Sequence, residues 1–210
     1  MILYEYLMSS ASYRVRIALS LKGVEVTSVT KQLRRGEQRL KDFLQLNPQG
    51  LVPALQLDDG RVLTQSLAII EYLDEVYPQP PLLPASPVER AHVRSMAQLI
   101  TCDIHPLNNL RVLQYLEGPL VQAPSTREAW YRHWIEAGFA ALEELLGRDP
   151  SRGRFCHGES PSIADVCLVP QVFNARRFSV DLNPYPQIVA IDAACHELAA
   201  FAGAAPERQT

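Results

Sequence analysis

Three serines in a short polar loop are the first residues of the chain whose type and spacing suggest chemistry. Ser9, Ser10 and Ser12 lie between an alternating strand pattern at residues 2–7 and a helical pattern at residues 13–22. A hydroxyl at a helix N-terminus can donate a hydrogen bond to a thiolate, and the helix dipole favours that negative charge. The same serines would also serve as ordinary helix caps. Both interpretations, a thiolate site and a cap, stay open from the residues alone.

A second candidate site lies at residues 47–73, which read NPQGLVPALQLDDGRVLTQSLAIIEYL. Pro53 interrupts an apolar run, so it must lie at a sheet edge, a strand start or a turn, and a cis Val52–Pro53 bond would fit. Gln65 and Ser66 directly precede an amphipathic helical pattern, which makes Ser66 a candidate N-cap and the helix start a candidate anion site. Backbone pairing at Val52 and amide donors at Gln65-Ser66 would suit a small extended peptide with a free α-carboxylate.

These motifs carry a resemblance to a known family. NPQGLVPAL followed by TQSLAIIEYL resembles the glutathione site of the glutathione transferases, with the family's cis-proline at Pro53 and its γ-glutamyl-binding pair at Gln65-Ser66. SSxSxRVRIAL and the later VPQV, RRF, VDL and PYP motifs resemble the zeta class, which includes maleylacetoacetate isomerase and maleylpyruvate isomerase. The resemblance implies glutathione as cofactor, a maleyl keto acid as substrate, and cis-trans isomerisation of maleylacetoacetate to fumarylacetoacetate in aromatic amino-acid breakdown.

The resemblance also assigns roles to individual residues. Ser9, with Ser10 beside it, takes the catalytic position, together with Arg177, whose planar guanidinium suits a carboxylate. Ala11 stands where the class has a cysteine, which removes a thiol that often contacts glutathione or substrate. The implied glutathione contacts are Ser9, Ser10, Ala11, Gln38, Gln49, Val52, Pro53, Gln65, Ser66, Asp103, His105 and Asn109, and the implied substrate contacts are Met8, Arg111 and Arg177. For each arginine the competing interpretation is a surface ion pair.

Several functions remain as alternatives. Maleylpyruvate isomerisation in gentisate breakdown is the nearest, although its members tend to have an arginine where this chain has the uncharged Met8. A broad conjugating or dehalogenating glutathione transferase is favoured by Ala11. A non-catalytic glutathione or ligand carrier would keep Pro53 and Gln65-Ser66 but would not need Ser9.

The predicted helices and strands fall into two groups, separated by a proline-rich linker at residues 78–87. Before it, the order strand, helix, strand, helix, strand, strand, helix resembles the thioredoxin fold. We expect an α/β thioredoxin-like domain at residues 1–79 and an all-helical domain at 86–210, the glutathione transferase fold. In the second domain the sequence predicts capping boxes that begin at Ser86, Ser125 and Ser162, a last helix at about residues 187–201, and a loose tail after it.

Composition excludes several kinds of partner. The net charge of −3 and pI of about 6.0 argue against nucleic acid or an anionic membrane as a bulk partner. The 4 cysteines show no CxxC and no metal-ligand spacing, so we expect reduced thiols and no metal site. With no signal peptide and no apolar run of membrane-spanning length, the sequence predicts a cytoplasmic protein, and the family resemblance implies a homodimer.

Overall fold

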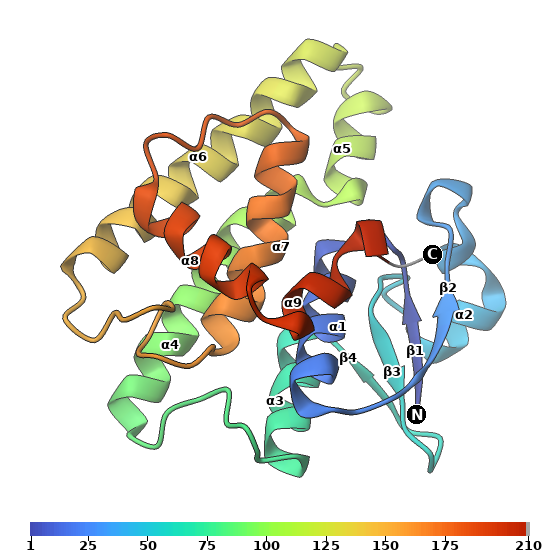
Figure 1. The fold of residues 1–210 in the computed structure, drawn as a ribbon. Coiled ribbons are helices and arrows are strands. Elements are labelled where there is room, and N and C mark those ends of the chain that lie inside the picture. Colours follow the sequence, from blue (N-terminus) through green and yellow to red (C-terminus); the bar gives the residue numbers. More distant parts are fainter. Residues whose placement is uncertain (209–210) are drawn as a thin grey trace. The chain divides into compact units, whose positions relative to one another are not determined.

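A computed structural model of the chain, which describes residues 1–208, groups it into two compact units (Figure 1). Unit 1 contains Met1–Pro81 and the segment that begins at Leu198, and unit 2 contains Leu82–Glu197. The segment after Glu197 therefore packs with the N-terminal part of the chain, whereas the sequence prediction placed it in the helical domain. The domain limits 1–79 and 86–210 stay a prediction.

Unit 1 is built on a four-stranded mixed sheet in the order β2-β1-β3-β4. β1 (Ile2–Glu5) pairs in parallel with β2 (Thr27–Thr30), and β3 (Ala54–Gln56) pairs antiparallel with both β1 and β4 (Val62–Thr64). Asp59-Gly60, a sequence typical of tight hairpins, joins β3 to β4, and Gly60 takes φ +88°, which glycine adopts without steric cost.

The helices of unit 1 cover both faces of this sheet. In Figure 1, α1 (Ser10–Lys22) and α3 (Ser66–Val76) lie on one side and the short α2 (Lys41–Leu46) on the other. Neighbouring strand residues point to opposite faces, so Leu3 is buried under α1 while the ring of Tyr4 packs edge-on against Phe43 of α2, with centroids 5.9 Å apart. The helix α1 ends at Gly23, which takes a left-handed φ of 63°. Short 3-10 turns at Leu33–Arg35 (η1) and Glu37–Arg39 (η2) precede α2.

The C-terminal segment completes unit 1. The prediction of one last helix followed by a loose tail is wrong, because the chain breaks after His196 and forms a separate helix α9 (Ala199–Ala204) and a 3-10 turn η5 (Pro206–Arg208). Phe201 is fully buried, and Arg16 Nε of α1 donates to the Ala204 carbonyl at 3.0 Å. These long-range contacts fix the C-terminal segment in place, although its composition alone would predict a loose tail.

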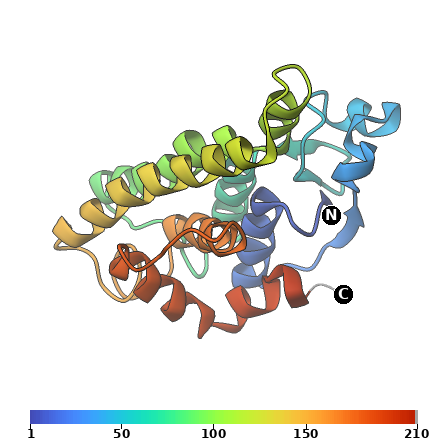
Figure 2. The same ribbon diagram turned by 90° about the horizontal axis from the view of Figure 1, so that it is seen from above.

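Unit 2 is helical throughout. Its elements are α4 (Pro87–Gln98), the π-helical segment η3 (Leu99–Ile104), the 3-10 turn η4 (His105–Asn108), α5 (Leu110–Glu117), α6 (Pro124–Arg148), α7 (Ile163–Arg177) and α8 (Pro186–His196). α7 is the central helix, buried along most of its length, and it packs against both α4 and α8, as Figure 2 shows.

The three predicted capping boxes have different outcomes. The Ser162 box is confirmed: Ser162 Oγ accepts from Ala164 N at 3.3 Å, and Asp165 accepts from Ser162 N at 2.7 Å. Ser86 is the N-cap of α4 as expected, but its side chain makes no cap hydrogen bond. The box at Ser125 is wrong. α6 begins at Pro124, whose fixed φ suits the first helical position, so Ser125 lies inside the helix.

Asp149, the residue after α6, makes hydrogen bonds to α4 and to the loop that follows α6. One carboxyl oxygen lies 2.6 Å from His92 Nε2 of α4, and the other accepts from Ser151 N at 2.8 Å. Burial alone would raise the pKa of Asp149. The hydrogen bonds from Ser151 and His92, with the charges of His92 and His157, outweigh burial and hold that pKa below its ordinary value.

The four cysteines are all free: Cys102 is exposed, whereas Cys156, Cys167 and Cys195 are buried. Burial raises the pKa of the Cys156 and Cys195 thiols, so these groups stay protonated. Within residues 1–208, no group of three His, Cys, Asp or Glu side chains is placed to hold a metal ion. Over the same range, no helix is both long and apolar enough to cross a membrane.

Candidate active site

Ser9 is the N-cap of α1. Its backbone is extended, and its Oγ accepts a hydrogen bond from Ser12 N at 3.2 Å. The capping interpretation is therefore right for Ser9, but it does not exclude a role in binding a thiolate. A serine hydroxyl has one hydrogen and two lone pairs, and the cap uses a lone pair. Among residues 1–208 no acceptor is bonded to the hydroxyl hydrogen of Ser9, which stays available to a ligand.

The other residues of the serine loop have distinct places. Ser12 is fully buried, and its Oγ accepts from Tyr6 N at 3.3 Å, so it holds the loop together from inside. Ser10 is buried at the first helical position, while Ala11 and Met8 are half-buried on either side of the Ser9-Ser10 pair. The first turn of α1 carries no acidic residue, so the positive end of its dipole is not neutralised by a carboxylate there.

The loop before β3 is held by Asn47, a residue that sequence reasoning missed. Asn47 is 2 % exposed, donates from Nδ2 to the Leu51 carbonyl at 2.7 Å, and accepts from Gln49 N at 3.1 Å. The predicted cis Val52–Pro53 bond is present, and Pro53 directly precedes β3, the strand start among its three predicted positions. The signal that could have revealed Asn47 is its place before Pro48, because asparagine side chains commonly bond to backbone groups in turns.

Gln38 and Gln49 lie around Gly50 in the same unit. A Cβ placed on Gly50 would lie 3.0 Å from the Gln38 carbonyl oxygen, and Gly50 takes φ +61°. Gln38 is buried, and its Oε1 has no hydrogen-bond partner among residues 1–208. A buried acceptor without a donor costs free energy unless a ligand or water supplies one.

The start of α3 differs from the prediction by one residue. Gln65 is the N-cap, with the rare φ of 70°, and Ser66 is the first helical residue rather than the cap. The Gln65 side chain does not cap the helix; its Nε2 donates to Gln49 Oε1 at 3.0 Å. A left-handed backbone at a residue other than glycine costs about 1–3 kcal/mol, and such residues cluster at functional sites. With no acidic residue in its first turn, the N-terminus of α3 is open to an anion.

Ser66 contacts a buried arginine that sequence reasoning also missed. Arg14 of α1 is 1 % exposed, and its Nη1 donates to Ser66 Oγ at 3.3 Å. Arg14 thus ties the helix capped by Ser9 to the helix that begins at Ser66. Its only signal in the sequence is a charged residue directly before the mostly apolar stretch that begins at Val15, which does not identify a partner.

The remaining candidates belong to unit 2. Asn109, predicted as a glutathione contact, is the N-cap of α5: its Oδ1 accepts from Arg111 N at 3.2 Å. Asp103 is exposed in η3, Arg111 is exposed in α5, and neither makes an ion pair within residues 1–208. His105 opens η4 and is half-buried.

Two neighbouring arginines at the end of α7 have different environments. Arg176 Nη2 lies 2.6 Å from the nearly buried carboxyl of Asp192, so it is the structural member of the pair. Arg177 is exposed and has no carboxylate within ion-pair distance among residues 1–208. Its guanidinium lies 5.5 Å from the centre of the Phe178 ring, which itself stacks on Tyr131. Within residues 1–208 the surface-ion-pair interpretation therefore finds no support at Arg177.

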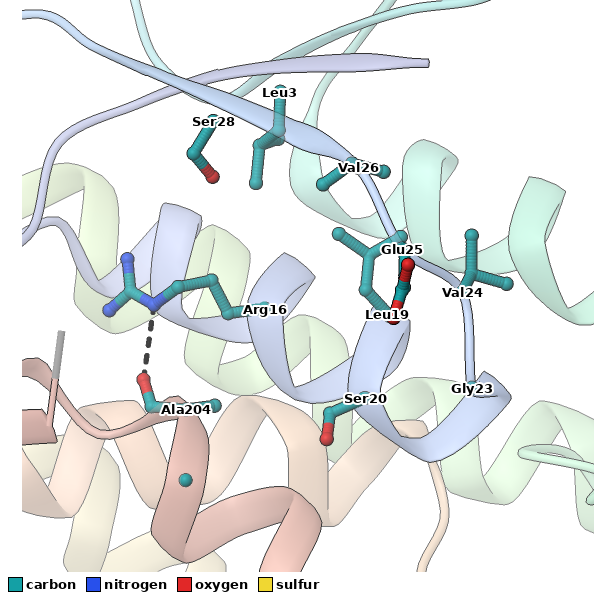
Figure 3. Close-up of a pocket in the computed structure, with 11 residues that line it drawn as sticks. Leu3, Arg16, Leu19, Ser20, Gly23, Val24, Glu25, Val26, Ser28 and Ala204 are labelled. Carbon is teal, nitrogen blue, oxygen red and sulfur yellow. Dashed lines mark hydrogen bonds between the residues drawn. The ribbon is translucent and has the colours of Figure 1, made fainter.

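A separate cavity of about 400 Å³ lies elsewhere in unit 1 (Figure 3). It is lined by α1, the 23–28 segment and α9, with Arg16 and Ala204 joined at one end. None of the predicted site residues lines it.

Comparison with known proteins agrees with this geometry. The family models described as "Glutathione S-transferase, N-terminal domain" and "Glutathione S-transferase, C-terminal domain" match residues 8–76 and 125–201. A maleylpyruvate isomerase from Ralstonia sp is 53 % identical over 99 % of this chain and 97 % of the relative.

Two solved structures are also informative. A holo structure of a bacterial zeta-class maleyl pyruvate isomerase shares a TM-score of 0.97 and 51 % identity, covering 100 % of this chain and 98 % of the other. A maleylacetoacetate isomerase from Anaeromyxobacter dehalogenans, solved with dicarboxyethyl glutathione and citrate in its active site, shares a TM-score of 0.86 and 41 % identity over 99 % and 94 % of the two chains. The chain therefore belongs to the glutathione S-transferase family and, within it, to the zeta class.

Proposed function

We propose that this protein catalyses the glutathione-dependent cis-trans isomerisation of maleylacetoacetate to fumarylacetoacetate in aromatic amino-acid breakdown. The observation that carries the proposal is Ser9: its hydroxyl caps α1 through a lone pair and keeps its hydrogen for a ligand, at a helix N-terminus with no acidic residue. A carrier that only bound the peptide would not need a donor there.

The residues of unit 1 fit a bound glutathione. The open N-terminus of α3 at Gln65 and Ser66 suits the γ-glutamyl carboxylate, and the Val52 backbone before β3 suits the peptide's own amide groups. The unpartnered Oε1 of Gln38 and the side chain of Gln49 supply polar groups for the glycyl end. Pro53, held in the cis form, shapes the turn that presents Val52.

Glutathione, when bound, supplies a thiolate that adds to the cis double bond, permits rotation about the resulting single bond and leaves again. Ser9 donates its hydroxyl hydrogen to the sulfur, with Ser10 and the amide of Ala11 beside it, and so holds the thiol in its ionised form. The positive end of the α1 dipole acts in the same direction.

Arg177 and Arg111 bind the carboxylates of the substrate. Both are exposed and lack an ion pair among residues 1–208, so neither has to leave a protein partner when a dicarboxylate arrives. His105 and Asn109 contribute polar contacts from the helical part of the chain, and Asp103 reaches toward the γ-glutamyl amine of the glutathione bound to the partner subunit. A relative's complex with dicarboxyethyl glutathione supports a dicarboxylate partner for the sulfur.

Maleylpyruvate is the second candidate substrate, favoured by the 53 % identical maleylpyruvate isomerase from Ralstonia sp. Met8 favours maleylacetoacetate, because its uncharged side chain stands where the maleylpyruvate enzymes tend to have an arginine. Ala11, in place of the cysteine usual in the class, would suit a broader transferase.

The test is an assay of maleylacetoacetate and maleylpyruvate side by side, with and without glutathione. We expect turnover only with glutathione and a higher kcat/KM for maleylacetoacetate. Turnover without glutathione would refute the mechanism, and binding of glutathione without turnover of either substrate would identify a carrier. We further propose that the protein is a cytoplasmic homodimer, which sedimentation analysis and cell fractionation test.

A further inference from the structure

We propose that Arg14 is a positioning residue for the carboxylate of glutathione: it orients the Ser66 hydroxyl toward the ligand and places a buried positive charge at the start of α3. The inference rests on the proposed glutathione site. It adds a residue that does not touch the peptide but decides how strongly its α-carboxylate is bound.

The geometry is confined to unit 1. Arg14 is the largest fully buried side chain among the described residues, at 1 % exposure, and it lies in α1, which packs against α3. Its Nη1 donates to Ser66 Oγ at 3.3 Å across a separation of 52 residues in sequence. Ser66 is itself buried, at 7 % exposure.

The hydrogen-bonding capacity of the two groups determines where the serine hydrogen points. A guanidinium only donates, so the hydrogen of Ser66 cannot be bonded to Arg14 and must point elsewhere. Among residues 1–208, Ser66 has no acceptor for it. The hydroxyl is therefore held with its oxygen toward the protein interior and its hydrogen toward the open N-terminus of α3.

The positive charge of Arg14 should strengthen carboxylate binding, as the orientation of the Ser66 hydroxyl does. A buried cation is weakly screened, and a hydroxyl that accepts from a guanidinium becomes a better donor on its other side. The first turn of α3 itself has no acidic residue. The ligand group that matches a polarised O–H, free backbone amides and a nearby cation is a carboxylate.

A positioning role predicts a specific split in the kinetics. Loss of a hydrogen bond to a charged group corresponds to a loss of affinity of roughly 10-fold to 100-fold. The KM for glutathione should rise by about that factor in Arg14 variants, whereas kcat at saturating glutathione should stay within about 2-fold, because the sulfur is held by other residues.

The experiment measures binding of two peptides by calorimetry. One is glutathione, and the other is its analogue with 4-aminobutanoyl in place of γ-glutamyl, which keeps the amine and lacks the α-carboxylate. Wild-type protein should prefer glutathione. Arg14→Gln removes the charge and Arg14→Lys keeps it while losing the fixed planar geometry, and both should lose most of this preference while binding the analogue as wild type does.

Controls separate positioning from packing. Arg16→Lys is the matched variant: Arg16 is also a buried arginine of α1, but it bonds to Glu5 and Ala204 rather than Ser66, so it should lower thermal stability and leave the peptide preference intact. Should the Arg14 variants fail to fold, Ser66→Ala removes the acceptor of the bond while Arg14 stays in place, and it should reduce the same preference. In a Ser66→Ala background, Arg14→Lys should then have little further effect.

Some results would overturn the inference. If the Arg14 variants weaken both peptides equally, or if Ser66→Ala leaves the preference unchanged, Arg14 has only a packing role. Wild-type protein that binds glutathione and isomerises substrate while showing no preference for the carboxylate would remove this inference and leave the proposed function standing. Wild-type protein that binds neither peptide would remove both.

Discussion

The two roles of Ser9 can be separated by replacing it with glycine and with alanine. Both substitutions remove the hydroxyl, but they differ in their effect on the helix. At an N-cap, alanine in place of serine costs about 0.5–2 kcal/mol, whereas glycine costs only about a few tenths of a kcal/mol. Ser9 has φ −78° and ψ 119°, an extended conformation that either residue adopts without strain.

The size of the catalytic effect follows from the bond that is lost. A hydrogen bond to a charged group contributes about 1.5–3 kcal/mol. At 1.36 kcal/mol for each pKa unit, its loss should raise the pKa of the bound glutathione thiol by about 1–2. Where the rate depends on the thiolate stabilised by this donor, the same energy corresponds to a loss in kcat/KM of roughly 10-fold to 150-fold.

The assay compares stability and activity in the same three proteins. Thermal unfolding should rank wild type and Ser9→Gly close together and Ser9→Ala below them. Isomerase activity and the pH titration of thiolate absorbance in the glutathione complex should instead rank the two variants together, both well below wild type. Ser162→Ala serves as a control, because Ser162 is a buried cap in unit 2 whose loss should lower stability without shifting the thiol titration.

One outcome would refute this reasoning. If Ser9→Gly keeps the wild-type rate and thiol titration while only Ser9→Ala loses them, the hydroxyl acts as a cap and not as a donor. The catalytic assignment would then pass to Ser10 or to the helix dipole alone.

Three further predictions concern arginines, glycines and acid. Arg177→Met should raise the substrate KM by at least about 10-fold because a charged carboxylate contact is lost, and it should change stability by less than about 0.5 kcal/mol. Arg176→Met should do the reverse, lowering stability by about 1–3 kcal/mol with little effect on KM, because the buried carboxyl of Asp192 loses its arginine partner and keeps only His196, 3.5 Å away. Gly50→Ala should cost about 1–2 kcal/mol because of the left-handed φ of 61°, while Gly147→Ala, a helical position with nothing within 4 Å, should gain up to about 1 kcal/mol in unfolding experiments. Asp149 has a folded-state pKa below its ordinary value of 3.8, so its contribution is present above that pH and is lost as pH falls through the folded-state pKa. Asp149→Asn should therefore lower Tm at pH 7, and the difference from wild type should shrink in acid.

The matched pairs define the results that would contradict these predictions. Equal effects of the Arg177 and Arg176 substitutions on KM would mean that neither binds substrate selectively. A neutral Gly50→Ala would mean that the loop can relax away from the Gln38 carbonyl. A difference between wild type and Asp149→Asn that persists unchanged to pH 3 would show that the effect comes from packing and not from the ionised carboxyl.

Much of the fold could be predicted because its signals are local. Gly23 ends α1, Asp59-Gly60 turns the hairpin, Pro53 precedes β3 in the cis form, and Ser162 with Asp165 caps α7. In each of these places the residue types and the bonds they make lie within a few positions of one another, so the local sequence is enough to predict the structure.

The site itself was predicted only in part. Sequence motifs predict Ser9, Gln65 and Ser66 as site residues, and this stays a prediction. The predicted cap at Ser66 is wrong, because the left-handed backbone of Gln65, which forms the cap, leaves no mark in the sequence. The resemblance assigns the substrate contact to Arg177, but two adjacent arginines do not show by themselves how their environments differ; that difference depends on the carboxyl of Asp192 from another helix.

The order of the elements, the peptide-binding motifs and the family can be read from the residue types alone. The folded chain adds which groups keep hydrogen-bonding capacity among residues 1–208: the Ser9 hydrogen left over after capping, the Ser66 hydrogen left over after Arg14 donates to its oxygen, and the Arg177 guanidinium, which has no ion-pair partner there. The physical reason is that hydrogen-bonding capacity is consumed by partners distant in sequence, such as the Arg14–Ser66 contact across 52 residues. A residue's type states how many bonds it can make, and only the folded chain shows how many are already made.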